Sequence, residues 1–489
     1  MGRAAEESVT SLRVWTERVI VGGLAPLVVF GSRFAGNIIL SRLLAPDEFG
    51  TAIAISVVLG LGGLVTDVAL DRFVIINGSA QALSTAHMLA VANSLLLAGA
   101  LVVTAPVTAG LFGVGNFAGS FALAAGLSAV GGFAHLGIKQ IQRNYNYGPD
   151  STAQVVANLT AIAALFLSAT ALRDHRAIVV SLAVQSVVYV ILSHVLARTP
   201  YQLSWDKPTL RQALSFGLPL TLNGVGLAIV SQLDRVLVGY WFGVKELAVY
   251  AVIFSMSVVP TYVIGSVFAG PSLSFLLSGG EAASDRSERY RLLLGFYSIL
   301  TSLYAVWMVL AVDILTPLIF GPSFTISPAA HVLFVLIACL RLQRSGAPTT
   351  FLLASGRTKQ LALLNLSSGF GLLIAFACIV AWPRLESMLV GIAIGEFISF
   401  MIFFTSLEKS TTRGSTVLID LVAAFATPTV MAAALAWDPA VTGQARGMLF
   451  LIGVMAVCAQ LSFEFYRNIK FRNLLFSVPI VLRESKTEG

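Results

Sequence analysis

Residues 216–259 decide the fold of this chain; they read FGLPLTLNGVGLAIVSQLDRVLVGYWFGVKELAVYAVIFSMSVV. The stretch consists of two long apolar segments joined by a short polar turn, and the first segment carries Asp234 and Arg235 side by side. Each segment is about as long as a helix that crosses a bilayer, which needs about 20 residues. Because ionisable groups are costly in hydrocarbon, we expect this pair to face protein or trapped water.

The composition extends this pattern to the whole chain. Of its 489 residues, 57% are hydrophobic and only 11% are charged, and the mean hydropathy is +0.86. Soluble domains carry about 25% charged residues, so these values exclude an ordinary soluble protein. The apolar residues occur in long blocks and not in the short alternating segments of a membrane barrel. We therefore predict an all-α polytopic membrane protein.

The chain also contains an internal repeat. Residues 32–55 align with residues 230–253 without a gap, at an offset that brings Leu44 onto Phe242. Further along, Phe112 and Phe320 each close the third apolar block of their half. We predict an N-lobe of six spans over 1–208, a C-lobe of six spans over 209–410, and two extra spans with a basic tail over 411–489. Six spans in each half give repeats related by an axis along the membrane normal.

The apolar blocks predict fourteen spans. They lie at about 19–41, 51–76, 83–111, 117–138, 151–171, 177–197, 213–241, 247–277, 291–320, 329–353, 360–382, 386–407, 415–436 and 447–466. If the N-terminus is cytoplasmic, twenty Lys and Arg residues lie in or beside the cytoplasmic connections and six in or beside the external ones. Cytoplasmic connections are the ones enriched in Lys and Arg, so both termini are expected in the cytoplasm.

Five segments together resemble the landmarks of bacterial polysaccharide-transport flippases. They are GSRFAGNIILSRLLAPDEFG (31–50), RQALSFGLPL (211–220), SQLDRVLVGYWFG (231–243), PLIFGPSFTISPAAHVLFVL (317–336) and ASGRTKQLALLN (354–365). This family, the O-antigen and exopolysaccharide translocases, belongs to the multidrug, oligosaccharidyl-lipid and polysaccharide exporter superfamily. The resemblance implies two pseudo-symmetric lobes around a central cavity that opens alternately to each side. It also implies a cargo of undecaprenyl-pyrophosphate-linked oligosaccharide, moved to the outer leaflet of the bacterial inner membrane.

Five arginines lie within the predicted spans: Arg33, Arg72, Arg235, Arg341 and Arg344. One charge at the bilayer centre costs roughly 2.5–3.5 kcal/mol on insertion scales, so we expect these groups to face a hydrated interior. A guanidinium binds phosphate oxygens through a two-pronged fork. We therefore predict Arg33, Arg341, Arg344 and Arg72 as cations that contact the cargo; pairing with acids or with lipid phosphates is the alternative. Arg341 and Arg344 are three residues apart and so share a helix face.

The acids within the spans are candidates for ion coupling. Asp67 and Asp71 are four residues apart in one predicted span, so their carboxylates would stack and compete for a proton; contact with headgroups is the alternative. Glu396 sits alone in its span and is either a helix-packing hydrogen bonder or a proton or sodium site. The roles of Asp67, Asp71 and Arg341 rest on chemistry alone, because they match no family motif. Asp234 and Arg235 are predicted as a structural or gating pair.

The sequence predicts no catalytic residue, no metal site and no cofactor. The five histidines are spread along the chain and are expected to form no cluster, and the three cysteines lie in apolar blocks. A glycosyltransferase, polymerase or ligase would need a large external loop, and every connection is short. We therefore expect a transporter and not an enzyme.

The intramembrane bases favour an anionic cargo. A multidrug or cation antiporter on the same scaffold, and a lipid II flippase, remain the alternatives. Expected partners are the lipid-linked glycan, membrane lipids, H⁺ or Na⁺, and a glycan polymerase or glycosyltransferase. The net charge of +7 needs no nucleic acid to explain it, and we expect a monomer.

The orientation can be tested with reporters. A reporter fused after Gly489 should behave as cytoplasmic, and one inserted beside Asp174 should behave as external, because the basic connections stay on the cytoplasmic side. The measurement is the activity of paired alkaline phosphatase and green fluorescent protein fusions at both positions. The opposite pattern would reverse the assignment of the two faces.

Overall fold

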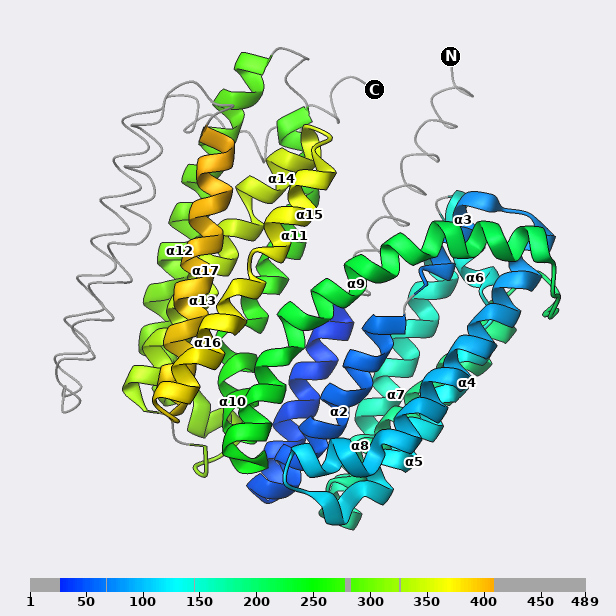
Figure 1. Cartoon of the computed structure of the whole chain (residues 1–489), viewed down its shortest axis with the longest axis horizontal. Coiled ribbons are helices and arrows are strands. Elements are labelled where there is room, and N and C mark those ends of the chain that lie inside the picture. The colour runs from blue at the N-terminus through cyan, green and yellow to red at the C-terminus, as the bar shows by residue number, and fades with distance from the viewer. Residues whose placement is uncertain (1–26, 67, 145, 278–282, 325–326, 409–489) are drawn as a thin grey trace, which may run out of the picture. The chain divides into compact units, whose positions relative to one another are not determined.

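The computed structural model describes residues 27–408, apart from 67, 145, 278–282 and 325–326. All regular elements in this part of the chain are helices (Figure 1). Ten helical segments in it are long and apolar enough to cross a membrane. The predicted all-α polytopic membrane fold is confirmed. The predicted spans 415–436 and 447–466 lie outside the described residues, so the count of fourteen stays a prediction.

The chain divides into two compact units. The first comprises Met1–Val252 and Ile319–Phe324, and the second comprises Ile253–Leu318 and Thr325–Gly489. This division falls within two helices of the second sequence repeat, at residues 252/253 and 318/319. The lobe boundary expected near residue 208 rests on the repeat and stays a prediction.

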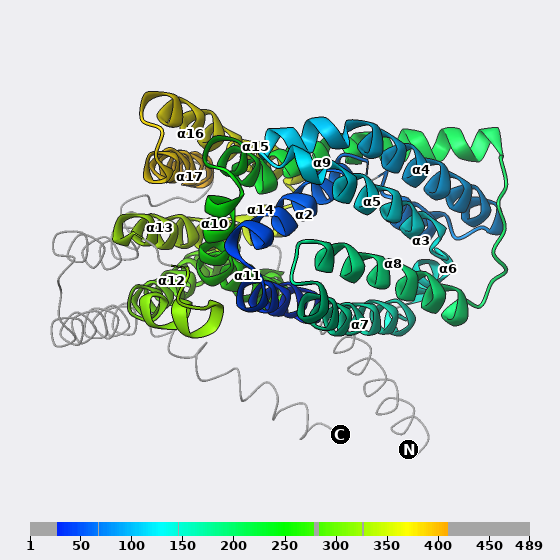
Figure 2. The same ribbon diagram turned by 90° about the horizontal axis from the view of Figure 1, so that it is seen from below.

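The first unit is built from long helices joined by short connections. After a first helix described over 27–43, its helices are α2 (Pro46–Thr66), α3 (Leu70–Asn77), α4 (Ala80–Leu111), η1 (Gly115–Phe117), α5 (Ala118–Ser128), η2 (Ala129–Phe133), α6 (Gly137–Gln140), η3 (Ile141–Asn144), α7 (Gly148–Leu172), α8 (Arg176–Leu196), α9 (Lys207–Phe242) and the start of α10 (Val244–Ser257). Helix α7 packs along α8, α4 along α5, and α2 along α9 (Figures 1 and 2).

The span predicted over 51–76 is not one continuous helix. Helix α2 ends at Thr66 and α3 starts at Leu70, because Ala69 has a left-handed backbone with φ 50°. Helix α9 packs against this break: a Cβ atom on Gly217 would lie 2.3 Å from the carbonyl oxygen of Val68. The break places Asp71 at the start of a new helix, out of the register that the sequence predicts.

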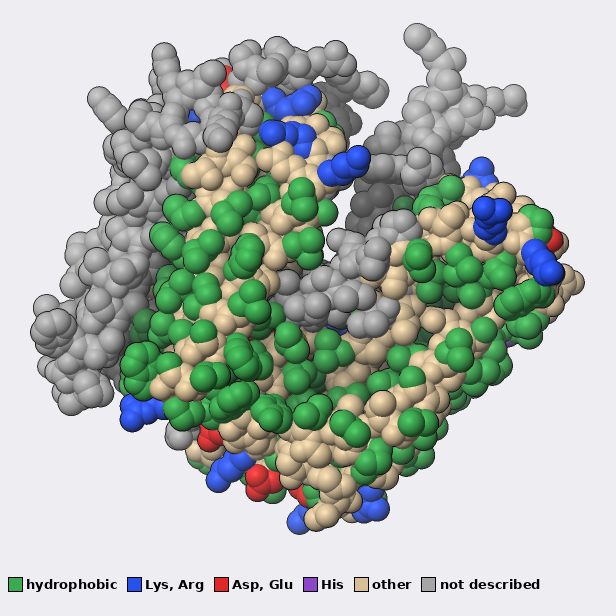
Figure 3. All heavy atoms as spheres, viewed as in Figure 1, with side chains coloured by type: hydrophobic (Ala, Val, Ile, Leu, Met, Phe, Trp, Pro, Cys, Tyr) green, Lys and Arg blue, Asp and Glu red, His purple; other side chains and the backbone are tan. Residues whose placement is uncertain are grey.

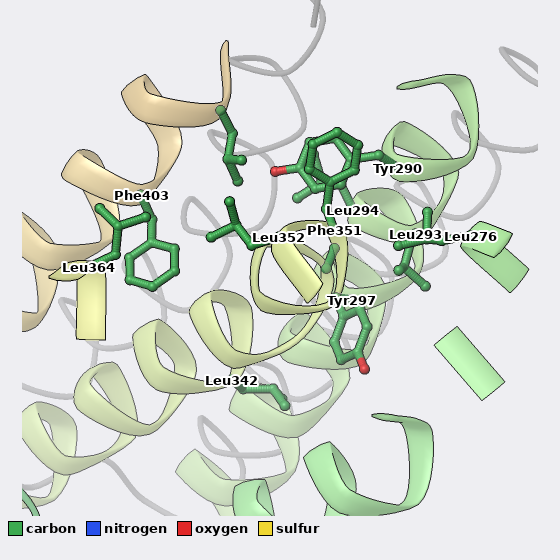
Figure 4. Close-up of a cluster of buried hydrophobic side chains, with 12 residues drawn as sticks. Leu276, Tyr290, Leu293, Leu294, Tyr297, Leu342, Phe351, Leu352, Leu364 and Phe403 are labelled. Carbon is green, nitrogen blue, oxygen red and sulfur yellow. The ribbon is translucent and has the colours of Figure 1, made fainter. Parts of the chain in front are cut away.

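The second unit surrounds a core of large apolar side chains. Its helices are the end of α10, α11 (Val259–Leu277), α12 (Ala283–Phe320) up to Leu318, α13 (Pro328–Ser345), α14 (Ala347–Ala354), α15 (Thr358–Leu366), α16 (Gly369–Ala381) and α17 (Leu385–Glu408). Figure 4 shows side chains from α12, α14 and α17 meeting in this core, among them Tyr290, Tyr297, Phe351 and Phe403. The rings of Tyr290 and Phe351 are 4.6 Å apart.

Small residues bring α16 and α17 into backbone contact. A Cβ atom on Gly395 would lie 1.9 Å from Gly371 Cα, and one on Gly391 would lie 2.4 Å from Ala375 Cα. Each helix thus presents two small residues four positions apart, the spacing with which membrane helices pack closely. Because lipid is as apolar as the helix surface, this packing and not burial from water holds the pair together.

Hydrophobic side chains cover most of the visible length of the helices, and Lys, Arg, Asp and Glu gather mainly toward helix ends (Figure 3). This distribution fits helices surrounded by hydrocarbon, in which charged groups are expensive.

Gly395→Val should separate α16 from α17, because the added methyl groups overlap the backbone of Gly371. The expected result is a fall in the midpoint of thermal unfolding in detergent, followed by tryptophan fluorescence or cysteine accessibility. The matched control is Gly99→Val on α4, where a Cβ atom meets nothing within 4 Å. Equal melting of the two variants would contradict the close packing.

Candidate functional site: a buried cationic centre

Two arginines and one glutamate form an ionic centre in the second unit. Glu396 on α17 lies between Arg341 and Arg344 on α13. Arg341 Nε is 2.7 Å from Glu396 Oε1, and Arg344 Nη2 is 3.3 Å from Glu396 Oε2. The side chain of Glu396 is only 3% exposed, and those of the arginines are 11% and 14% exposed. All three groups lie in helices that are apolar enough to cross a membrane.

Helical spacing explains this arrangement. Helix α13 is capped at Ser327, whose hydroxyl accepts from the backbone N–H of Ala330. Arg341 and Arg344 then lie three residues apart on one face, as the sequence predicts. On α17, Glu396 and Ser399 are also three residues apart, and both contact Arg344. Glu396 follows Gly395 directly, so the α16–α17 contact fixes the helix that carries the carboxylate.

Hydroxyl groups complete the shell around Arg344. Its Nη1 donates to Ser368 Oγ and, at 3.1 Å, to Ser399 Oγ. Ser367 Oγ is 2.7 Å from Ser399 Oγ. Ser367 and Ser368 lie at the junction of α15 and α16, so this junction brings two polar side chains to the centre. Arg341 Nη1 also reaches Tyr262 OH on α11, at 3.4 Å.

The centre carries a net charge of +1, because one carboxylate faces two guanidinium groups. Glu396 is the sole ionisable residue in the middle of its predicted span, and the structure supplies its ionic partners from another helix. Its partners come from a helix more than fifty residues away in the chain. Glu396 Oε2 has no hydrogen-bond partner among the described residues, so its contact with Arg344 is ionic without hydrogen-bond geometry.

Arg33 and Arg235 lie apart from this centre, in the first unit. Arg33 is exposed on the helix at 27–43 and has neither a hydrogen bond nor an ion pair among the described residues. It lies close enough to Arg235 for the two charges to repel. Arg235 donates to the side chain of Gln232. Asp234 is buried and accepts a 2.6 Å hydrogen bond from Tyr250 OH, so it joins α9 to α10.

The remaining predicted residues lie around α3. Asp71 is half-buried in the first turn of α3, and Arg72 beside it is exposed. Asp71 Oδ1 accepts from the backbone N–H of Arg72 at 2.8 Å. Asp67 lies outside the described residues. The argument that the two carboxylates stack on one continuous helix is wrong, because Val68 and Ala69 between them are not helical and α3 starts only at Leu70.

Comparison with known proteins identifies the family. A family model described as polysaccharide biosynthesis protein matches residues 39–327, which is more than half of the chain. The chain belongs to this family. No curated protein matches the sequence.

Solved structures with similar folds are transporters of the MOP superfamily and a flippase. "Lipid II flippase MurJ, inward closed conformation" aligns over 91% of this chain and 99% of its own length, with a TM-score of 0.65 and 13% identity. An inward-facing multidrug resistance MATE family transporter aligns over 79% and 94%, with a TM-score of 0.58 and 14% identity. At these identities the likeness shows the fold. These two structural neighbours are a flippase and a transporter.

A second polar centre, which the sequence analysis does not predict, surrounds Asp150 in the first unit. Its Oδ2 accepts from Lys139 Nζ at 2.8 Å and from the amides of Gln142 and Gln154 at 2.9 Å each, and its Oδ1 accepts from Tyr189 OH at 3.0 Å. The partners come from α6, η3, α7 and α8. The only sequence signal is that an acid, Asp150, directly precedes an apolar span. An acid at that place is also typical of an ordinary helix N-terminus.

The expectation that the histidines form no cluster is wrong. The rings of His87 and His135 lie 4.7 Å apart, and those of His135 and His194 lie 5.3 Å apart. Tyr201 stacks 4.4 Å from His87. His87 lies in α4, His135 lies between η2 and α6, and His194 lies near the end of α8, so residues far apart in the chain come together. The described residues contain no group of His, Cys, Asp or Glu that could hold a metal ion.

Glu396→Ala should destabilise the second unit, because it leaves two buried guanidinium groups without their carboxylate. Removing one partner of a buried ion pair costs about 3–5 kcal/mol. The measurement is the free energy of unfolding in mixed micelles. The control is Glu246→Ala on α10, where the glutamate is exposed and a change within about 0.5 kcal/mol is expected. Similar losses in both variants would argue against the ionic centre.

Proposed function

We propose that this protein is an alternating-access flippase. Its cargo is an undecaprenyl-pyrophosphate-linked oligosaccharide, an O-antigen or exopolysaccharide repeat unit, and it moves the cargo from the inner to the outer leaflet of the bacterial cytoplasmic membrane. The observation that carries this proposal is the net positive centre of Arg341, Arg344 and Glu396 within apolar helices. Membership in the polysaccharide biosynthesis protein family supports the glycan part of the cargo.

A pyrophosphate group would compete with Glu396 for the arginines. Guanidinium forks bind carboxylate and phosphate oxygens with the same geometry. In the structure the carboxylate contacts one nitrogen of each arginine, Arg341 Nε on one oxygen and Arg344 Nη2 on the other. Arg344 Nη1 donates to serine hydroxyls instead. Glu396 thus holds the cationic centre in place without neutralising it. An arriving diphosphate would take up the excess positive charge.

Arg33 and Arg235 supply a second concentration of positive charge. The two groups repel each other, and such repulsion is relieved when an anion binds near both. The proposed role of Arg33 as a cargo contact rests on this proximity and on its exposure. Arg72 is exposed as well and keeps its place among the candidate cargo contacts.

The structure bears differently on the three ion-coupling candidates. A proton or Na⁺ at Glu396 would have to displace a guanidinium from a carboxylate oxygen, which makes Glu396 a better holder of the arginines than an ion site. Asp71 remains a candidate, because its side chain is half-exposed and its described contact is to a backbone N–H. Asp67 is a candidate from the sequence alone.

A multidrug antiporter on this scaffold would carry cations. Positive groups at the centre of the second unit and near Arg33 would repel such a cargo. A lipid II flippase would carry an anionic lipid, as the proposed protein does, so the nature of the glycan distinguishes the two. Expected partners are the glycosyltransferases and the polymerase that make and use the cargo.

Arg33→Ala and Arg344→Ala should each leave the protein inserted in the membrane and stop the assembly of surface glycan. Each variant loses a cation that the diphosphate needs in a region of low dielectric. The measurement is surface glycan in a strain whose chromosomal copy is deleted, with membrane levels checked by immunoblot. Arg33→Lys keeps the charge and should retain partial activity, and Arg384→Ala, exposed outside the spans, should be unaffected.

Full activity of both alanine variants would overturn the cationic-site proposal. Loss of drug efflux with intact surface glycan would point instead to the multidrug antiporter.

A further inference from the structure

Three side chains meet at one end of the first unit, where α2, α5 and α8 begin. His175 precedes α8, Glu48 lies in the first turn of α2, and Ser120 lies in the first turn of α5. Glu48 Oε2 is 2.6 Å from His175 Nδ1 and accepts the backbone N–H of His175 at 2.9 Å. Ser120 Oγ is 2.8 Å from His175 Nε2. The charge distribution of the chain predicts that this end faces the outside of the cell.

The three contacts allow His175 to gain or lose a proton without losing a hydrogen bond. In the neutral ring, Nδ1–H donates to Glu48 and Nε2 accepts from the hydroxyl of Ser120. In the charged ring, Nδ1–H still donates to Glu48, and Nε2–H donates to Ser120 Oγ. A serine hydroxyl serves as donor or acceptor by rotating about its C–O bond, so Ser120 fits both states.

The clustered histidines, His87 and His135, make a different kind of hydrogen bond. His87 Nε2 accepts the backbone N–H of Leu136 at 3.0 Å, and His135 Nδ1 accepts that of Gly137 at 3.0 Å. Their second nitrogens face the carbonyl oxygens of Gln202 and Thr199. A backbone N–H cannot turn into an acceptor, so a proton on either ring would break a hydrogen bond. Burial also lowers the pKa of His135.

The charges around His175 favour the uptake of one proton. Glu48 faces its ring from α2, and Asp174 precedes it in the chain. Arg176 pairs with Asp174 at 2.6 Å. From α5 and η1 the ring meets the uncharged Ser120 and Phe117, whose ring is 4.3 Å away. One arginine against two carboxylates leaves a charge of −1, which a proton on His175 would cancel. The carboxylates also offset the positive ends of the three helices.

Access and burial suit a site that exchanges protons. His175 is only 4% exposed, whereas the side chain of Glu48 is 27% exposed. The nitrogen that gains the proton, Nε2, lies against the hydroxyl of the half-buried Ser120, so the proton reaches the ring through this hydroxyl, while Glu48 stabilises the charged ring at Nδ1. The ring in turn ties together the starts of α2, α5 and α8, so its charge acts on all three helices.

We propose that His175, Glu48 and Ser120 form a proton-binding site, open to the outside of the cell, that couples a proton gradient to transport. The coupling rests on the proposed function, whereas the proton site itself does not. The site does not include Asp71 or Glu396. Glu48 belongs to the landmark segment 31–50, whereas Ser120 and His175 lie outside the five landmark segments.

The proton site can be tested without transport. The full chain is labelled with ¹⁵N-histidine in nanodiscs, and the signals of His175 are identified by their loss in His175→Gln. Between about pH 8 and pH 5, the range in which histidine changes charge, Nε2 should change reversibly from unprotonated to protonated with constant circular dichroism. In Glu48→Gln the protonated form should be less populated at each pH. A ring that keeps one protonation state throughout would overturn the site.

Coupling is tested in proteoliposomes at fixed internal pH. The probe is lipid-linked glycan extracted from the cells that carry the chain, and the rate of its transfer is measured as external pH is varied. The wild-type rate should change on the order of tenfold over one or two pH units, as expected for one controlling proton. His175→Gln, whose amide can keep both side-chain hydrogen bonds, should remove this dependence. His194→Gln, at an exposed histidine, should retain it.

The two failures are distinguishable. Glycan transfer with the same pH dependence in the wild type and in His175→Gln would overturn the coupling and leave the flippase intact. A titrating His175 with no glycan transfer in any variant would overturn the flippase and the coupling, and would leave the proton site.

Discussion

Each charge placed among apolar helices needs a partner, and this requirement shapes both units. Hydrocarbon offers no water to solvate an ion, so a lone charge is expensive. In the second unit, Glu396 meets this need for Arg341 and Arg344. In the first unit, Asp234 is held by Tyr250, and Asp150 is held by four side chains. These contacts connect helices that apolar surfaces alone would not orient, because lipid competes equally for such surfaces.

The connections between helices determine where the polar groups gather. The junction of α15 and α16 brings Ser367 and Ser368 to Arg344. The starts of α2, α5 and α8 bring Glu48, Ser120 and His175 together. Ser120 on α5 supplies the hydroxyl beside the ring of His175, which directly precedes α8. Interrupted helices and helix termini thus position the reactive groups, and the long apolar stretches hold those termini at a fixed depth.

The sequence predicted the fold class because it is determined by composition and by the length of apolar blocks, both of which are local properties. It also predicted that Arg341 and Arg344 share a face, since that depends only on helical spacing. It did not predict their pairing with Glu396, because the register between two membrane helices depends on small residues such as Gly395, whose partners lie elsewhere in the chain. The break before α3 was missed for a related reason: Ala69 is no obvious helix breaker, and tertiary contact with Gly217 accompanies its left-handed backbone. The histidine contacts were missed because they join α4, the connection before α6, and α8, which are distant in the sequence.

The backbone contact between α16 and α17 has a mechanical consequence. With Gly371 and Ala375 against Gly391 and Gly395, no layer of side chains lies between the two helices to slide or repack. The α16–α17 hairpin is therefore expected to be rigid, and it carries Glu396. The neighbouring helices α13 and α14 form a joint at Gly346, where the helix is interrupted. A Cβ atom on Gly346 would lie 2.3 Å from the ring of Tyr297. A bend at that joint would shift α14 relative to α13, whereas the α16–α17 hairpin that carries Glu396 would move as one body.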